Sequence, residues 1–224
     1  MKNKKDDSFK HFTNDVRPHR EYQWLSVYHQ LSIPTCLDDV NSILEFGPGR
    51  GLAKAVFNHY GLEYVCSDVV DFGAQPDHLL SIEEFPTDRK FDLVCAFQAL
   101  EHNPFEEFPK YLRKMRDLSN KYVYISLPFC GRWFGLNVCL NVPGFNKHFS
   151  KALTFERLFK KQRPTAQYRQ SSTPFAHHWF EVGDKGVSKN DIKNIAKENG
   201  LKQVDSFHVS LFPYHYFVLM QKEL

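Results

Sequence analysis

A short apolar run followed by alternating glycines constrains this chain more than any other stretch. Residues 43–46 are typical of a strand buried in a parallel sheet, and glycines follow at positions 47, 49 and 51. Because glycine lacks a Cβ, the chain can turn sharply there and a ligand can lie against bare backbone. From Leu52 apolar residues recur at helical spacing as far as Gly61, a suitable helix end. The stretch predicts a strand, a loop and a helix N-terminus whose N–H groups point at a nucleotide-type ligand.

Two common nucleotide-binding loops do not fit this stretch. The dinucleotide loop needs glycines in the pattern G-x-G-x-x-G, and its third position is occupied here by Leu52. The phosphate-binding pattern G-x-x-x-x-G-K-S/T is absent. Taken alone, the glycines are also compatible with a tight strand-to-helix turn that binds nothing.

The pattern that does stand here is Glu45-x-Gly47-x-Gly49-x-Gly51. It closely resembles the first motif of class I S-adenosylmethionine (SAM)-dependent methyltransferases. The resemblance implies SAM as the cofactor. It also implies a cofactor loop made of Glu45, Gly47, Pro48, Gly49 and Gly51.

A carboxylate stands where a second cofactor contact is expected. Residues 63–68 predict the next strand, with Asp68 at its carboxyl end and 19 residues after Gly49. An acid at about this distance binds the ribose hydroxyls in dinucleotide folds. By resemblance Asp68 is the ribose-binding acid of a methyltransferase. A role as a turn or cap residue is the alternative.

Residues 91–97 begin Phe-Asp-Leu-Val and resemble the fourth strand of small-molecule methyltransferases. That family often carries an acid at the end of the third strand to hold the adenine amino group, but Ser81 occupies this position here. We therefore expect Ser81 or the backbone near Ile82 to contact adenine. Phe97 and Gln98, at the end of the fourth strand, are assigned to the same cofactor site.

The turn after the fourth strand carries the first candidate base. Residues 98–104 are close to the Leu-Glu-His turn of the quinone-biosynthesis and type-11 methyltransferases, and they lie where open α/β sheets bind ligands. A hydroxyl acceptor needs a base near it, and histidine suits because its ordinary pKa is near neutrality. His102 is the first candidate, although it could equally cap the following helix.

A second group of candidates lies in residues 177–183, which resemble a segment of some type-11 methyltransferases. His177 and His178 are the second candidates for the base, with Glu181 as an orienting carboxylate. Their spacing matches no zinc site, so we expect no metal. Hydrogen bonding that holds the neighbouring segment in place is the alternative role.

Residues 130–170 fit the resemblance least. They contain eight Lys or Arg against one acid, Glu156, with aromatic residues interleaved. In this fold an insertion after the fifth strand usually forms part of the acceptor pocket or a lid, so we expect residues 129–185 to be an acceptor-side lid. The charge balance favours an anionic acceptor, or peripheral contact with an anionic membrane through 130–170. An ordinary solvated flap is the alternative.

Nucleic acid is disfavoured as the target. The net charge is only +3, and the sequence lacks both the D/N-P-P-Y/F/W motif and the catalytic Pro-Cys of DNA methyltransferases. We therefore expect a small-molecule, saccharide or lipid-linked acceptor.

The end of the chain predicts a helix and a hairpin. Ser188 and Asp191 have the spacing of a capping box that opens a helix over 191–199. Two strands follow at 202–209 and 214–221, and their tight connection implies that they are antiparallel.

Together these patterns predict one methyltransferase domain over residues 1–224. The expected fold is α/β, a Rossmann-like doubly wound and mostly parallel seven-stranded sheet with an antiparallel last strand. Residues 1–17 are expected to be a flexible tail. A helix over residues 18–34 either covers the cofactor mouth, as the resemblance implies, or packs on the sheet edge.

The five cysteines are odd in number and form no C-x-x-C pair, and the polar N-terminus does not read as a signal peptide. We expect a reduced, cytoplasmic protein. The expected function is SAM-dependent methyl transfer. A non-catalytic SAM-binding regulatory module is one alternative, and a nucleotide-dependent oxidoreductase is another, which Leu52 argues against.

Overall fold

The computed structural model describes residues 21–156, 178–184 and 186–223, so the expected tail at 1–17 lies outside the described residues. In chain order the longer elements are α2 (Glu21–Cys36), β1 (Ser42–Phe46), α3 (Leu52–His59), β2 (Glu63–Ser67), β3 (Phe91–Phe97), α4 (Phe108–Leu118), β4 (Ser119–Pro128), β5 (Arg132–Val142), β6 (Phe145–Phe155), α6 (Lys189–Glu198), β7 (Leu201–Val209) and β8 (Phe212–Lys222). Two short 3₁₀ helices, η1 (Leu100–His102) and η2 (Phe105–Glu107), precede α4.

The central sheet confirms the predicted fold class. Its strand order is β2-β1-β3-β4-β8-β7, with β1 to β4 parallel and β8 antiparallel to both β4 and β7. Among the described residues it has six strands rather than the expected seven. The third strand, expected to end at Ser81, forms only one parallel bridge, between Ser67 and His78. Leu79 is 64% exposed, so extending the strand there would bury little apolar surface.

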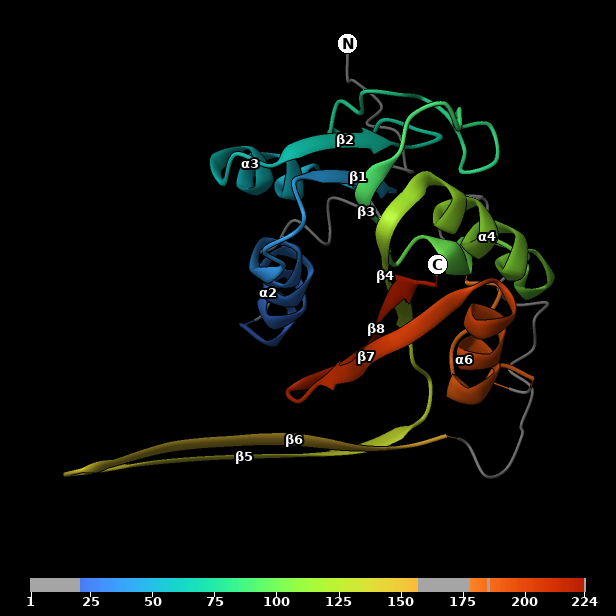
Figure 1. The fold of residues 1–224 in the computed structure, drawn as a ribbon. Coiled ribbons are helices and arrows are strands. Elements are labelled where there is room, and N and C mark those ends of the chain that lie inside the picture. The colour runs from blue at the N-terminus through green and yellow to red at the C-terminus, as the bar shows by residue number, and fades with distance from the viewer. Residues whose placement is uncertain (1–20, 157–177, 185, 224) are drawn as a thin grey trace, which may run out of the picture.

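Helices cover both faces of the sheet (Figure 1), with α2 and α3 on one side and α4 and α6 on the other. Successive side chains of a strand point to opposite faces, and the two cores follow this alternation. Ile43 and Leu93 pack in the cluster that includes Phe57 of α3. Leu44 and Val94 pack in the cluster that includes residues of α4 and α6. The parallel strands are buried on both faces, which is why they read as continuous apolar runs.

Helix α2 packs on the sheet rather than lining the cavity described below. It begins near the predicted position and continues to Cys36, two residues past Pro34. The Tyr124 hydroxyl donates to the His29 carbonyl oxygen, and the buried Ser26 hydroxyl lies 2.7 Å from His215 Nδ1. These contacts hold α2 against β4 and β8.

The predicted helix and hairpin at the end of the chain are confirmed. The capping box forms as expected, since Asp191 N–H donates to the Ser188 hydroxyl and Ser188 N–H donates to the Asp191 carboxylate. The hairpin turn lies at residues 210–211, so Pro213 belongs to β8 instead of the connection.

The insertion contains a long hairpin that the sequence analysis did not predict. Strands β5 and β6 pair over their whole length and project from the body as a two-stranded arm (Figure 1). Apolar residues alternate along 134–142 and Pro143-Gly144 follows, which is the pattern of a strand entering a turn. Residues 157–177 lie outside the described part, so a lid over 129–185 stays a prediction. Among the described residues, no helix has both the length and the apolar character needed to cross a bilayer.

Candidate active site

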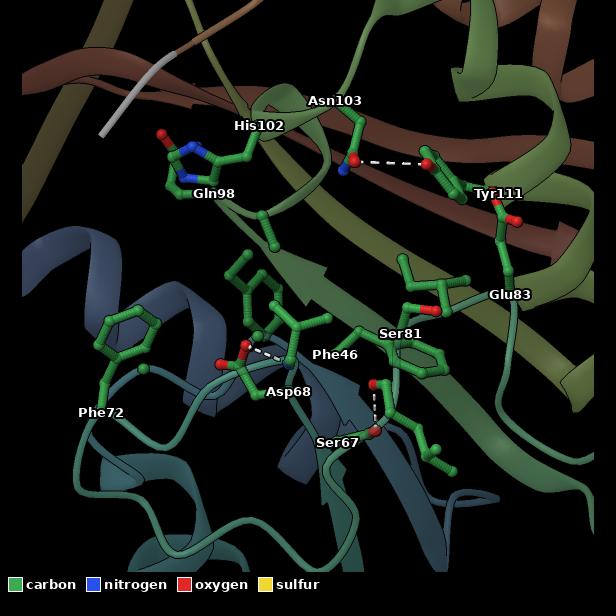
Figure 2. A pocket seen from close by; sticks show the side chains of 17 residues that line it. Phe46, Ser67, Asp68, Phe72, Ser81, Glu83, Gln98, His102, Asn103 and Tyr111 are labelled. Carbon is green, nitrogen blue, oxygen red and sulfur yellow. Dashed lines mark hydrogen bonds between the residues drawn. The ribbon is translucent and has the colours of Figure 1, made fainter. Parts of the chain in front are cut away.

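A cavity of about 600 Å³ opens at the carboxyl ends of β1, β2 and β3 (Figure 2). Seven residues assigned to the cofactor site line it: Gly47, Gly49, Asp68, Ser81, Ile82, Phe97 and Gln98. The candidate base His102 lines it as well. The ends of parallel strands meet at one edge of the sheet, which is how residues from distant parts of the sequence converge here.

The glycine loop forms one wall, and its backbone explains the glycines. Gly47, Gly49 and Gly51 have φ values of +72°, +57° and +74°, a region that side chains with a Cβ rarely adopt. A Cβ on Gly47 would lie 2.8 Å from the Ala99 Cβ, so that glycine also permits close packing under the loop. A Cβ on Gly49 would meet no atom of the described part of the chain within 4 Å. Gly49 therefore presents bare backbone to open space, as a loop that contacts a cofactor must.

Asp68 stands at the end of β2 with its carboxylate at the cavity. Its Oδ1 accepts a hydrogen bond of 2.8 Å from Val69 N–H, which fixes the direction of the side chain (Figure 2). Burial raises the pKa of Asp68, with the backbone hydrogen bonds acting in the opposite direction. A partly buried carboxylate that accepts hydrogen bonds is suited to binding ligand hydroxyls.

The wall expected to contact adenine is mainly apolar. Phe46, Leu80, Ile82 and Phe97 line it. The Ser81 hydroxyl donates to the Glu84 carboxylate at 2.8 Å and so is used within its own turn. Of the two contacts expected there, the backbone near Ile82 is the better placed.

Three residues assigned to the cofactor loop do not line the cavity: Glu45, Pro48 and Gly51. Glu45 is 4% exposed and accepts a hydrogen bond from the Tyr64 hydroxyl on β2. Burial raises its pKa to about 7. Glu45 thus braces β1 against β2 behind the loop, because its side chain points to the neighbouring strand, and Gly51 forms the left-handed N-cap of α3.

Around His102 the structure assembles a polar cluster. The His102 and His178 rings lie 5.4 Å apart between centroids. His178 Nδ1 is 3.1 Å from Glu181 Oε1 and 3.4 Å from the Tyr214 hydroxyl. His178 and Glu181 do not line the cavity itself, and His177 lies outside the described residues. The structure therefore brings His178 and Glu181 together with His102, as a second layer behind it.

Glu101 is the functional candidate that the sequence analysis missed. It is fully buried, and neither carboxylate oxygen has a hydrogen-bond partner among the described residues. Its Oε1 lies 3.9 Å from His178 Nε2. Burial raises the Glu101 pKa to about 7, and the nearby His178 acts in the opposite direction. Its place inside the Leu-Glu-His turn was visible, but its burial against residues 178–181 depends on the tertiary fold.

Other cavity residues were also missed, namely Phe72, Glu83, Asn103 and Tyr111. The Tyr111 hydroxyl lies 3.3 Å from Asn103 Oδ1, and Glu83 pairs with Lys110 at 2.9 Å. These residues come from loops and from α4, and no local pattern marks them as a set.

Two groups of side chains bring potential metal-ligand atoms within 4.8 Å of one another: Glu101, His102 and His178, and Cys130, Glu181 and Asp184. Neither has the sequence spacing of a structural zinc site. The closeness of these atoms does not test the expectation, made from the sequence, that the protein binds no metal.

The chain matches a known family over most of its length. A family model described as a methyltransferase domain matches residues 16–206. No curated protein matches this sequence.

Solved structures of methyltransferases share the fold. Magnesium protoporphyrin IX methyltransferase from Synechocystis, with S-adenosylhomocysteine bound, is 15% identical with a TM-score of 0.57, over 90% of this chain and 83% of that chain. A didemethyltoxoflavin N1-methyltransferase from Burkholderia thailandensis is 15% identical with a TM-score of 0.56, over 96% and 84%. A sugar N-methyltransferase from Streptoalloteichus is 12% identical with a TM-score of 0.53, over 96% and 93%. At these identities the similarity establishes the fold.

Proposed function

The chain belongs to the methyltransferase-domain family, and we propose that it transfers a methyl group from SAM to a small-molecule, saccharide or lipid-linked acceptor. The observation that carries this proposal is the cavity, where the glycine loop, Asp68 and His102 converge. Its volume of about 600 Å³ is within the range of small-molecule sites.

The residues present fit SAM in three respects. A Cβ built on Gly49 would meet no atom of the described residues within 4 Å, so the backbone there is open to a ligand. Asp68 supplies a carboxylate for the two ribose hydroxyls. Phe46, Leu80 and Phe97 form apolar walls suited to a flat base. Bound there, SAM supplies an activated methyl group that an acceptor atom can attack in line.

The protein's main contribution to the reaction is positioning. Holding two reactants in a productive orientation can be worth effective molarities of ~10⁵ M or more. The cofactor loop follows β1 and the His102 turn follows β3, which is the neighbouring strand. Both therefore face the same cavity, where cofactor and acceptor can be held in one orientation.

His102 is placed to take the proton that a hydroxyl acceptor loses when its oxygen bonds to the methyl carbon. It lines the cavity, whereas His178 lies behind it. Positive charge that develops on His102 would be stabilised by Glu101 in its ionised form, because a Glu101 carboxylate oxygen and a His102 ring nitrogen lie within 4.8 Å of each other, and Glu181 contacts His178 beside them. Glu101, His178 and Glu181 act here as positioning residues.

The proposed class of acceptor rests on the composition of the insertion. The basic and aromatic residues of 130–170 favour an anionic or lipid-linked acceptor over a neutral one.

All five cysteines are free thiols, and Cys66 and Cys95 are buried. Free thiols suit a reducing compartment, so we place the enzyme in the cytoplasm.

Calorimetry and thermal melting with S-adenosylhomocysteine and NAD test the proposal. A ligand that binds only the folded protein raises its stability by RT ln(1 + [L]/Kd), about 2.7 kcal/mol at a hundredfold excess over Kd. We expect S-adenosylhomocysteine to raise the melting temperature and NAD to leave it unchanged. The reverse result would support an oxidoreductase and overturn the proposal.

A further inference from the structure

The β5–β6 hairpin separates its side chains into two unlike faces. Residues directly opposite in an antiparallel pair point to the same side of the ribbon. One face, here called the apolar face, carries Arg132, Phe134, Leu136, Val138, Leu140, Val142, Phe145, Lys147, Phe149, Lys151, Leu153 and Phe155. The other, here called the polar face, carries Trp133, Gly135, Asn137, Cys139, Asn141, Asn146, His148, Ser150, Ala152 and Thr154.

The polar face is the one that contacts the body of the protein. Ser210, in the β7–β8 turn, donates to Asn137 at 3.2 Å and also lies within hydrogen-bond distance of Ser150. Lys189 Nζ donates to the Thr154 hydroxyl at 2.6 Å. A Cβ on Gly135 would lie only 2.6 Å from the Ser210 carbonyl oxygen, so the backbones approach closely there. The apolar face is therefore turned away from the body.

The apolar face exposes far more hydrocarbon than a folded chain normally leaves in water. Its nine large apolar side chains are each between 45% and 60% exposed, from Val142 and Phe145 to Phe134. Contiguous exposed apolar patches of this kind mark interaction sites. A ribbon of two strands has no second layer of its own to cover them.

The charges on this face identify what covers it. Arg132, Lys147 and Lys151 lie among the apolar side chains, and residues 131–155 contain no Asp or Glu. Two copies of the face packed against each other would bring cations together with no hairpin carboxylate to offset them. An anionic phospholipid surface supplies both the apolar boundary and the counter-charges.

We propose that the apolar face of the β5–β6 hairpin binds the surface of a membrane that contains anionic phospholipid. Phe134, Phe145 and Phe149 enter the boundary between headgroups and acyl chains, where amphipathic surfaces bind. The stems of the basic residues lie along this apolar surface while their charged ends reach the phosphates.

The hairpin binds flat and shallow, because its two edges carry unpaired backbone groups that need water or headgroups as partners. Each strand has 11 residues, so the arm extends for roughly 36 Å along the surface.

This surface is separate from the cavity, because no hairpin residue lines it. The inference therefore stands or falls without the proposed methyl transfer, and its test needs no acceptor. The measurement is sedimentation of the full chain with vesicles of 70% phosphatidylcholine and 30% phosphatidylglycerol, compared with vesicles of phosphatidylcholine alone. We expect binding to the mixed vesicles, at least tenfold weaker binding to the neutral ones, and weakening as salt shortens the Debye length.

The first variant removes the charges: Arg132→Gln with Lys147→Gln and Lys151→Gln. A basic residue near an anionic surface strengthens binding roughly fivefold, so the triple change should weaken binding to the mixed vesicles by about a hundredfold. The matched control changes three exposed lysines elsewhere to Gln: Lys193, Lys197 and Lys202. It alters the net charge equally and should reduce binding far less.

The second variant, Leu136→Thr with Leu140→Thr, reduces the apolar surface while introducing β-branched residues, which suit a strand. Its control is Leu79→Thr with Val204→Thr, which are exposed outside the hairpin. We expect only the hairpin variant to lose vesicle binding, with the melting temperature and S-adenosylhomocysteine affinity unchanged in both.

Equal binding to neutral and anionic vesicles, or binding to neither, would overturn the inference. So would a dimer, seen by sedimentation velocity without lipid, that Leu136→Thr with Leu140→Thr dissociates, because a second copy would then be the occupant.

Discussion

The cavity and the β5–β6 hairpin are built in opposite ways. The cavity lies at the ends of strands that helices cover on both faces, and left-handed glycines shape its loop. The hairpin has two strands, with a polar face that contacts the body through Asn137, Ser150 and Thr154 and an apolar face that is exposed along its length. In the cavity, local backbone conformation creates the binding surface, so a short motif predicts it. In the hairpin, strand pairing decides which side chains share a face, so composition alone does not reveal the surface.

The comparison predicts that each region can be damaged without the other. The largest effect is expected from Gly49→Val, which puts a branched side chain into the space beside the loop and strains a backbone at φ +57°. Calorimetry should detect no SAM binding, while vesicle binding persists. Gly61→Val is the control, because Gly61 has φ +72°, a Cβ there would meet no described atom within 4 Å, and the residue lies outside the cavity lining. If both variants lose SAM equally, strain and not contact explains the loss.

The next largest effect is expected from His102→Gln. Removing a positioned base typically lowers turnover by ~10²–10⁴-fold. We expect turnover to fall in this range while S-adenosylhomocysteine affinity changes little, since the loop and Asp68 are intact. Wild-type turnover of His102→Gln across pH 6 to 9 would remove this residue from the mechanism.

A smaller loss is expected from Asp68→Ala. Hydrogen bonds to a charged group contribute about 1.5–3 kcal/mol, so SAM affinity should fall by roughly 10- to 150-fold. Asp88→Ala, an exposed acid outside the cavity lining, is the matched control. Calorimetry that finds wild-type affinity in Asp68→Ala would refute the ribose assignment.

The smallest effect is expected in the pH dependence of stability. Glu101 has a folded-state pKa raised to about 7, so the folded protein binds its proton more tightly than the unfolded chain does. The free energy of unfolding should therefore decline as the pH rises from 4.5, the ordinary pKa of Glu, to about 7, the folded-state pKa. Above pH 7 this group should contribute no further change.

Glu101→Gln removes that titration, and thermal melting from pH 4 to 8 should show a flatter profile than the wild type. Glu106→Gln, an exposed acid, should leave the profile unchanged. An unaltered profile in Glu101→Gln would show that Glu101 does not titrate in this window. Neither variant should change vesicle binding.

Elements with a strong local signal were predicted well. The β1 strand, the glycine turn and the α6 capping box each depend on residues that contact one another within a few positions. The third strand, expected to end at Ser81, was overpredicted, because apolar residues before it such as Leu79, which is exposed, do not by themselves show whether a neighbouring element covers them.

The sequence by itself determined the fold class and the position of the cofactor loop. A positive φ at Gly47 and Gly49 is a requirement of backbone geometry that glycine meets without strain. The acid at the end of β2 was identified by its distance along the sequence from that loop. The sequence also placed His102 beside the cavity.

Only the tertiary structure decided which groups surround His102 and which residues face outward on the hairpin. Glu101 and His178 are far apart in the sequence, and they meet because the Trp179 N–H donates to the Glu101 carbonyl oxygen at 2.8 Å. The apolar face exists because β5 and β6 pair in one register, and a shift of one residue would mix the two faces. Contacts between segments far apart in the sequence determine both the groups around His102 and the apolar face of the hairpin, and no local sequence pattern predicts those contacts.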